Sequence, residues 1–110
     1  NGIAKKSKRT NQILGCSGNQ LAKIIEDQFT DGMNWNNRDK WHIDHVRPIK
    51  TFNVLETDQL MVCFNWRNLK PLWDLENRKK GARYSKKDEK IWIERMRNLG
   101  FEGDLFKKFS

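Results

Sequence analysis

The stretch Trp41–Pro48, with the sequence WHIDHVRP, organises the expected fold. It sets two imidazoles and a carboxylate among apolar neighbours, and these are the chain's two histidines. An apolar, β-branched context is typical of a short strand, so the polar cluster is expected on a sheet. There, Asp44 is a candidate metal ligand and a neutral His45 a candidate general base for hydrolysis. Such a site needs a second oxygen ligand from elsewhere in the chain.

Length and composition indicate one domain with a modest core. The chain has 110 residues, of which 36% are hydrophobic and 33% are charged. A chain of this length buries roughly 65% of its unfolded surface. Five tryptophans and six phenylalanines supply bulk for that core. This aromatic content argues against a disordered chain.

The charge balance points to a polyanionic partner. The formal net charge is +8 and the pI is about 9.7. Lysines and arginines that neutralise phosphates release condensed counterions, which favours a nucleic acid partner over charge kept for solubility alone. Residues 1–12 (NGIAKKSKRTNQ) are basic and nearly free of apolar side chains. They are expected to form a flexible basic arm, either a solvated tail or an accessory contact to a nucleic acid backbone.

The cysteine pattern excludes two classes of small domain. Cys16 and Cys63 are too far apart for a zinc half-site, and no second pair exists to complete a zinc knuckle or a disulfide scaffold. No signal peptide and no apolar run near about 20 residues is present, so a reduced, soluble, intracellular protein without a membrane partner is expected. The start at Asn1 instead of Met suggests a processed chain or a fragment of a protein with neighbouring domains.

Upstream of the central stretch, the sequence predicts one amphipathic helix. Ser17 or Asn19 is a candidate cap, and residues 31–32 (DG) are expected to end the helix. Its apolar side chains fall on one face: Leu21, Ile24, Ile25 and Phe29. Trp35 and Trp41 are expected to pack in the core, in preference to stacking on bases.

Downstream, the pattern predicts a short helix over residues 56–65 and a second extended segment over residues 68–73 (NLKPLW). Pro71 restricts that segment to a sheet edge or a strand end. Asp74 is the expected cap of a helix over residues 75–83, which Gly81 weakens.

A last helix is expected to start at a capping box formed by Ser85 and Asp88 and to end at Gly100. Its apolar stripe comprises Ile91, Trp92, Met96 and Leu99. Residues 101–110 are left as a C-terminal tail.

A hairpin folded against the helix over residues 75–83 brings Asp44 and Asn77 to one point. Oxygen ligands from a carboxylate and an amide favour Mg²⁺ or Mn²⁺ over zinc. One such metal ion, with a histidine activating water opposite it, is sufficient for phosphodiester hydrolysis.

This constellation resembles the His-Asn-His (HNH) endonucleases. The likeness rests on residues 44–48 (DHVRP), 68–73 (NLKPLW) and 76–81 (ENRKKG). Residues 14–17 (LGCS), with Gln28-Phe29 and Gly32-Met33-x-Trp35, look like the lead-in of HNH proteins from phages and large viruses. The resemblance implies an α+β fold with a ββα-metal hairpin and helix, flanked by further helices. The HNH domain would span residues 13–100, with the motif core at 41–83.

By this resemblance, Asp44 and Asn77 are the metal ligands, His45 is the general base, and Asn68 braces the loop through backbone hydrogen bonds. Asn77 stands where many relatives carry histidine, which weakens a zinc assignment. His42 would lie beside the metal, through water or in support of Asp44. Candidates for contact with DNA phosphates are Lys79, Lys80 and Arg83. Strand alternation puts His42 and Asp44 on one face and His45 on the other. The family arrangement accommodates this because the strand ends there.

The implied function is metal-dependent cleavage of DNA by a homing-type or phage-encoded HNH endonuclease, through nicking or double-strand cutting with one Mg²⁺ or Mn²⁺ ion. A phage-infected or bacterial host cell is the expected setting. Two alternatives stay open: a restriction or defence nuclease with the same core, and a non-catalytic DNA-binding module with a vestigial site. No protein partner is evident. Target sequence, strand outcome and oligomeric state are left undetermined by the sequence.

Overall fold

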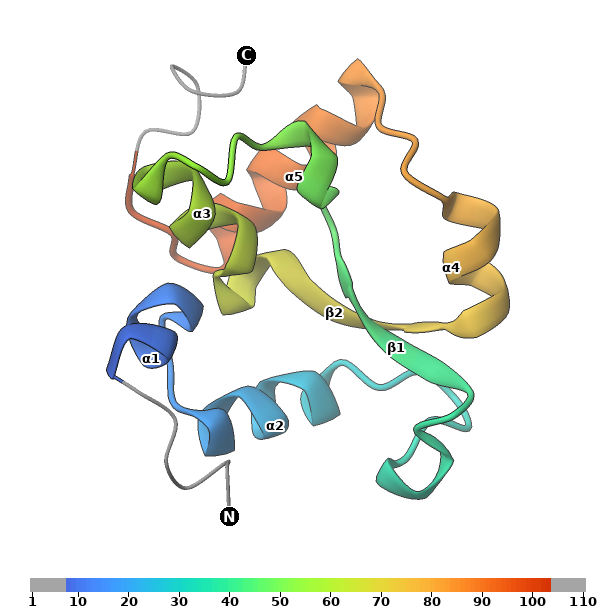
Figure 1. Ribbon diagram of the computed structural model, residues 1–110. Helices are drawn as coiled ribbons and strands as arrows, with labels where there is room; N and C mark the ends of the chain where they lie inside the picture. The colour runs from blue at the N-terminus through green and yellow to red at the C-terminus, as the bar shows by residue number, and fades with distance from the viewer. Residues whose placement is uncertain (1–7, 104–110) are drawn as a thin grey trace.

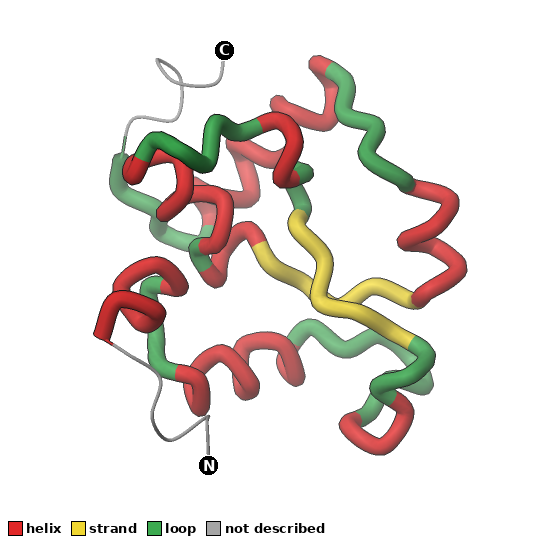
Figure 2. The backbone as a smooth tube through the Cα atoms, in the orientation of Figure 1, coloured by secondary structure: helices red, strands yellow, loops and turns green. Residues whose placement is uncertain are grey.

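A two-stranded antiparallel sheet lies at the centre of the molecule (Figures 1 and 2). It pairs β1 (Trp41–His45) with β2 (Leu69–Trp73), in a register that runs from Trp41 opposite Trp73 to His45 opposite Leu69. The structure is a computed structural model that describes residues 8–103. Each strand of a two-stranded sheet is an edge strand, which is why Pro71 is tolerated within β2. Both strands form where the sequence predicts extended segments.

Helices precede, connect and follow the two strands, so the α+β class predicted from the sequence is confirmed. They are α1 (Lys8–Leu14), α2 (Gly18–Asp27), α3 (Thr57–Phe64), α4 (Asp74–Lys80) and α5 (Lys86–Asn98), with short 3₁₀ turns at Trp35–Asn37, Ile49–Thr51 and Trp66–Asn68. None of the helices within residues 8–103 is long and apolar enough to cross a membrane.

Local capping explains where two of the helices begin. The Ser17 side chain accepts a hydrogen bond from the Gln20 N–H, and the Gln20 side-chain oxygen accepts one from the Ser17 N–H. Ser85 and Asp88 form the same reciprocal box at the start of α5. Each box satisfies N–H groups that the first helical turn leaves without partners. Ser17, and not Asn19, is therefore the cap of α2.

Three sequence-based boundaries are corrected by the structure. The flexible arm predicted for residues 1–12 is wrong from Lys8 onwards, because these residues form α1, which packs against α3. Residues 1–7 of that arm lie outside the described residues. Asp74 is the first residue of α4 and makes no capping bond, and α4 ends at Lys80. In the predicted tail, the Phe101 N–H donates to the Met96 carbonyl, and residues 104–110 lie outside the described part.

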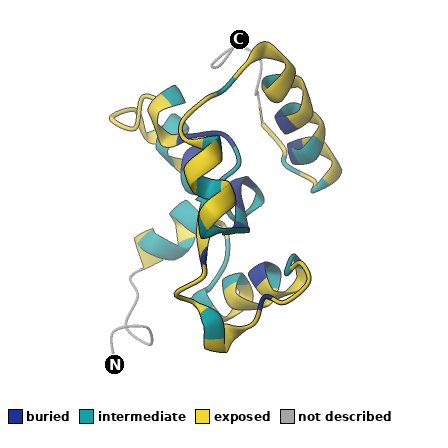
Figure 3. Cartoon of the chain, turned by 90° about the vertical axis from the view of Figure 1, so that its right-hand side faces the viewer, coloured by how far each residue is buried: buried dark blue, intermediate teal, exposed yellow. Residues whose placement is uncertain are grey.

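The buried residues form two apolar clusters, and Figure 3 shows buried, intermediate and exposed positions alternating along the helices. The cluster beside α2 comprises Ile25, Met33, Trp41 and Leu69. The cluster between α3 and α5 comprises Phe52, Val62, Cys63, Trp92 and Met96.

Trp41 is fully buried, as expected, while Trp35 is 41% exposed and donates its indole N–H to Glu26. Trp35 therefore lies at the rim of the core. Ile91 is 56% exposed, so its predicted core position is wrong. Ile93 packs against the core instead.

Candidate functional site

Helix α4 follows β2 without a loop and packs on both strands of the sheet. In Figure 1 it lies at the edge of the molecule, beyond the far end of β2. Residues three apart on a helix share a face, so Asp74, Asn77 and Lys80 point to the same side. This face of α4 and the end of β1 form the candidate site.

The carboxylate of Asp44 is engaged by the last residue of α4. The Lys80 ammonium donates to Asp44 Oδ2, to the His45 carbonyl oxygen at 2.8 Å and to the Val46 carbonyl oxygen at 3.5 Å. The Asp44 side chain is 15% exposed and that of Lys80 is 27% exposed. Water therefore screens this ion pair less than it screens a pair on the open surface. The Lys80 ammonium is thus surrounded by one carboxylate oxygen and two backbone carbonyl oxygens at the end of β1.

A second contact between β1 and α4 forms at the start of the helix. His42 Nε2 lies 3.0 Å from Asp74 Oδ1, and the other oxygen of Asp74 pairs with Arg78. His42 and Asp44 share a face of β1. Asn77 lies between Asp74 and Lys80 on the same face of α4. The structure thus pairs His42 with Asp74 and Lys80 with Asp44, and Asn77 occupies the helix position between these two contacts.

His45 lies next to this ion pair but in a more apolar setting. Its ring meets the Phe64 ring edge to face, with 4.9 Å between the centroids. Burial lowers the pKa of His45; Asp44 opposes that change and Lys80 adds to it. The imidazole is therefore neutral near pH 7, which is the form that accepts a proton. Its Nε2 atom is buried and has no hydrogen-bond partner among the described residues.

Asn68 is fully buried, and its amide bonds join the connection between the strands to α5. Its Oδ1 accepts from the Arg47 N–H at 2.8 Å and from the Trp92 indole N–H at 2.9 Å. Its Nδ2 donates to the Cys63 carbonyl at 2.8 Å and to the Arg47 carbonyl at 3.2 Å. The Asn68 side chain thus fixes the backbone that leaves β1 just after His45.

Sequence reasoning missed the roles of Arg47 and Trp92, which both bond to Asn68. Arg47 is 4% exposed, pairs with Glu89 at 2.7 Å and lies over the rings of Phe52, Tyr84 and Trp92. A buried arginine requires a paired carboxylate. The apolar setting of Arg47, between Val46 and Pro48, is the one sequence signal that indicates its burial. The Trp92 indole N–H, bonded to Asn68, has no comparable signal because helical spacing shows only that Trp92 is in the core.

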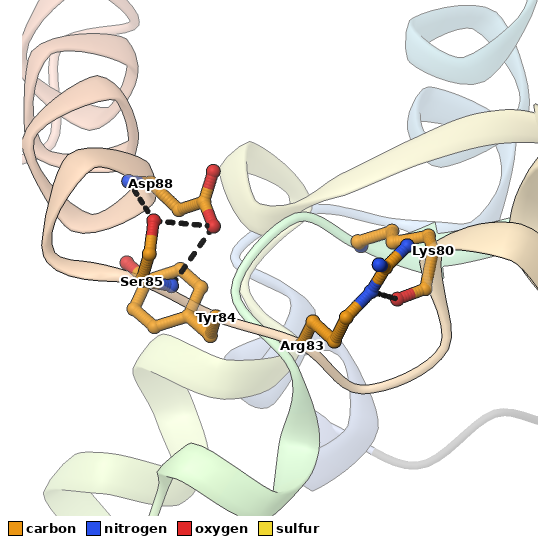
Figure 4. Close-up of a pocket in the computed structure, with 5 residues that line it drawn as sticks. All are labelled: Lys80, Arg83, Tyr84, Ser85 and Asp88. Carbon is orange, nitrogen blue, oxygen red and sulfur yellow. Dashed lines mark hydrogen bonds between the residues drawn. The ribbon is translucent and has the colours of Figure 1, made fainter.

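Two of the cationic candidates, Lys80 and Arg83, line a pocket at the end of α4 (Figure 4). The pocket encloses about 630 Å³ and is lined by Lys80, Arg83, Tyr84, Ser85 and Asp88. Arg83 is exposed and donates from Nε to the Lys80 carbonyl at 3.2 Å and from Nη2 to the Lys79 carbonyl. Lys79 is exposed on α4.

The oxygen atoms of Asp44 and Asn77 suit a hard cation such as Mg²⁺, but the Lys80 ammonium already occupies Asp44. Among residues 8–103, no group of three or more His, Cys, Asp and Glu side chains gathers that could hold a metal ion. A site made from Asp44 and the Asn77 amide is smaller than such a group. The Lys80 ammonium shows that a positive charge is stabilised there by carboxylate and carbonyl oxygens, which are ligands typical of Mg²⁺. A metal ion bound to Asp44 would have to replace this ammonium.

Comparison with known proteins gives viral relatives of undescribed activity. No protein-family model and no solved structure matches the chain. Two proteins of Acanthamoeba polyphaga mimivirus, named uncharacterized proteins L426 and L246, are 43% identical over 72 residues and 40% identical over 67 residues. The matches cover 64% and 60% of this chain but 32% and 30% of the relatives. The chain therefore spans about a third of the length of these relatives.

Proposed function

We propose that this chain is the catalytic domain of an HNH-type endonuclease that hydrolyses DNA phosphodiesters with Mg²⁺ or Mn²⁺. The observation that carries the proposal is the position of Asp44 against the α4 face of Asn77 and Lys80, with a neutral His45 adjacent to it in the chain. A two-stranded sheet followed directly by a helix on its face is the arrangement that the HNH resemblance implies.

Each residue of the proposed site has a separate task. Asp44 and Asn77 would hold the metal ion, which supplies Lewis acidity at the scissile phosphate when bound. His45 takes a proton from the attacking water, for which the neutral imidazole is ready. Asn68 keeps the backbone after His45 in place, so the imidazole keeps one orientation. His42 orients the start of α4 through Asp74.

The proposed substrate follows from charge. The formal net charge of +8 favours a polyanion, and the basic residues of the last turn of α4 lie next to the proposed metal ligands. The viral relatives are compatible with a homing or phage-like setting, which remains part of the proposal.

Cleavage of supercoiled plasmid tests the proposal. We expect nicked or linear product from the wild type with Mg²⁺ or Mn²⁺ and none with chelator. His45→Ala is expected to lower the cleavage rate by about 100-fold or more, since general-base catalysis contributes roughly that much. Far-UV circular dichroism and DNA binding of the variant are the controls for folding. Cleavage by His45→Ala at near wild-type rate would refute the assigned base.

One observation favours a second candidate, a DNA-binding module without catalysis. The Lys80 ammonium already neutralises Asp44, as expected where no metal ion is needed. Under this alternative, DNA binding is unchanged by Mg²⁺, Mn²⁺ or chelator, and no cleavage occurs with any of them.

A further inference from the structure

Lys80 belongs to two neighbouring sites at once. Its ammonium bonds with Asp44 and the carbonyl oxygens at the end of β1, and the same side chain lines the pocket shown in Figure 4. Lys80 is the last residue of α4, and Gly81 follows it with a φ of 55° and a ψ of −140°. A lysine has four rotatable side-chain bonds, so its ammonium can turn from one site to the other without moving the helix.

The pocket has a cationic side and an anionic side. Arg83 stands next to Lys80, and bonds to two α4 carbonyls fix its guanidinium, which has further N–H groups to donate. At the other side, the Asp88 carboxylate accepts from the N–H and the hydroxyl of Ser85. Figure 4 shows this separation, with Lys80 and Arg83 on one side and Ser85 and Asp88 on the other. A phosphate group therefore suits the side of Lys80 and Arg83.

An ammonium and a divalent metal ion compete for Asp44. Two cations near one carboxylate repel each other, and the contact is shielded from water, which makes that repulsion stronger than at an open surface. The place left for the displaced ammonium is the pocket, where a DNA phosphate would compensate its charge.

We propose that Lys80 is a two-position cation, paired with Asp44 when no metal is bound and turned into the pocket with Arg83 to bind a DNA phosphate when a divalent ion takes Asp44. This inference rests on the proposed metal site at Asp44 and Asn77. It makes metal and DNA binding cooperative, since each ligand relieves the competition that weakens the other. By thermodynamic linkage, both affinities rise by the same factor.

Metal binding without DNA tests the first position. Mn²⁺ affinity of the full chain is measured by electron paramagnetic resonance for the wild type, Lys80→Met, Asp44→Asn and Lys79→Met. Lys79→Met is the matched control because it removes an equal charge one residue away, from an exposed side chain. We expect Lys80→Met to bind Mn²⁺ about tenfold more tightly than the wild type, within the usual range of site coupling. Lys79→Met should bind like the wild type.

DNA binding tests the second position. Anisotropy of a labelled duplex is measured with and without Mn²⁺ in a His45→Ala background, which prevents cleavage. We expect the increase in DNA affinity caused by Mn²⁺ to be about tenfold larger with Lys80 present than in Lys80→Met. An equal increase in both would overturn the second position. With Mn²⁺, Lys80→Met should also reduce the slope of log affinity against log salt by about one, as for the loss of one phosphate contact.

The outcomes separate this inference from the proposed function. If Asp44→Asn binds Mn²⁺ like the wild type, the proposed metal site is wrong and the inference falls with it. If Asp44→Asn loses Mn²⁺ but Lys80→Met binds it no more tightly than the wild type, the two-position role alone is overturned. Failure of both the wild type and Lys80→Met to bind Mn²⁺ overturns the metal site and the inference together.

Discussion

The end of β1 is held from two sides in different ways. On one side, Asn68 is fully buried and its amide makes four hydrogen bonds, among them bonds to Arg47 and Trp92. On the other side, none of the residues of α4, all of them within the described chain, is buried. Helix α4 reaches β1 through the contacts of Asp74 with His42 and of Lys80 with Asp44. The candidate base thus stands on a fixed support, while the helix that carries Asn77 is attached by exchangeable polar contacts.

The largest effect is expected from removing the fixed support. Asn68→Ala removes the buried hydrogen bonds of Asn68 with the Trp92 indole N–H and with backbone groups of Arg47 and Cys63, and each lost bond costs about 1–3 kcal/mol. We expect the free energy of unfolding to fall by about 4 kcal/mol, measured by urea denaturation. The matched variant Asn77→Ala, on the partly exposed α4 face, should change it by less than about 0.5 kcal/mol. An equal fall in the free energy of unfolding for both variants would show that Asn68 supports the end of β1 no more firmly than α4 does.

A smaller effect is expected from pH, through Cys63. Burial raises the pKa of this thiol to about 11 from its ordinary value of 9.0. As the pH rises, the unfolded chain therefore loses the thiol proton before the folded chain does. The stability that the buried, protonated thiol contributes, at most about 3 kcal/mol, is lost between about pH 9 and pH 11.

Urea denaturation at pH 8 and pH 10.5 measures this loss. Burial also raises the pKa of Tyr84, so the wild type must be compared with a variant that keeps the tyrosine. The stability advantage of the wild type over Cys63→Ala should shrink from the lower to the higher pH. A constant advantage would show that the thiol titrates alike in the folded and unfolded chains.

The smallest effect is expected at the start of α4. The His42 side chain is 49% exposed and that of Asp74 is 30% exposed, and ion pairs at such positions are worth about 0–1 kcal/mol. A double-mutant cycle of His42→Ala and Asp74→Ala should therefore give a coupling energy below about 1 kcal/mol, with amide exchange accelerating in α4. A coupling of several kcal/mol would mean that α4 is held as firmly as Asn68.

Local signals in the sequence were sufficient for most elements. The capping pattern of Ser85 and Asp88 located the start of α5, and apolar spacing located α2 and α3. The pattern did not reveal α1, because its residues are largely polar and its packing against α3 is a long-range contact. Helical spacing did not show which neighbour of Trp92 faces the core. Ile91 was predicted there, but Ile93 is the residue that packs against it.

The sequence named candidate site residues but not the contacts that they make. Asp44 and Asn77 were expected to meet, and in the structure Asn77 lies on α4 between Asp74 and Lys80, which contact His42 and Asp44 of β1. The contact of Lys80 with Asp44 depends on where α4 ends relative to the sheet, which is a tertiary property. The resemblance predicted that Asn68 braces the loop through backbone hydrogen bonds, and three of its four bonds do go to backbone groups of Arg47 and Cys63. Its bond with the Trp92 indole had no sequence signal, because Trp92 comes from a distant segment.

The connection over residues 46–68 enters and leaves the sheet at one clamped point, where Val46 N–H donates to the Asn68 carbonyl. Between these ends, Leu55 is 93% exposed and lies just before α3. Loop-closure entropy grows only slowly with loop length, so extra chain inserted here costs little. A tag or a second binding module could therefore be inserted at Leu55 without breaking the hydrogen bond between Val46 and Asn68.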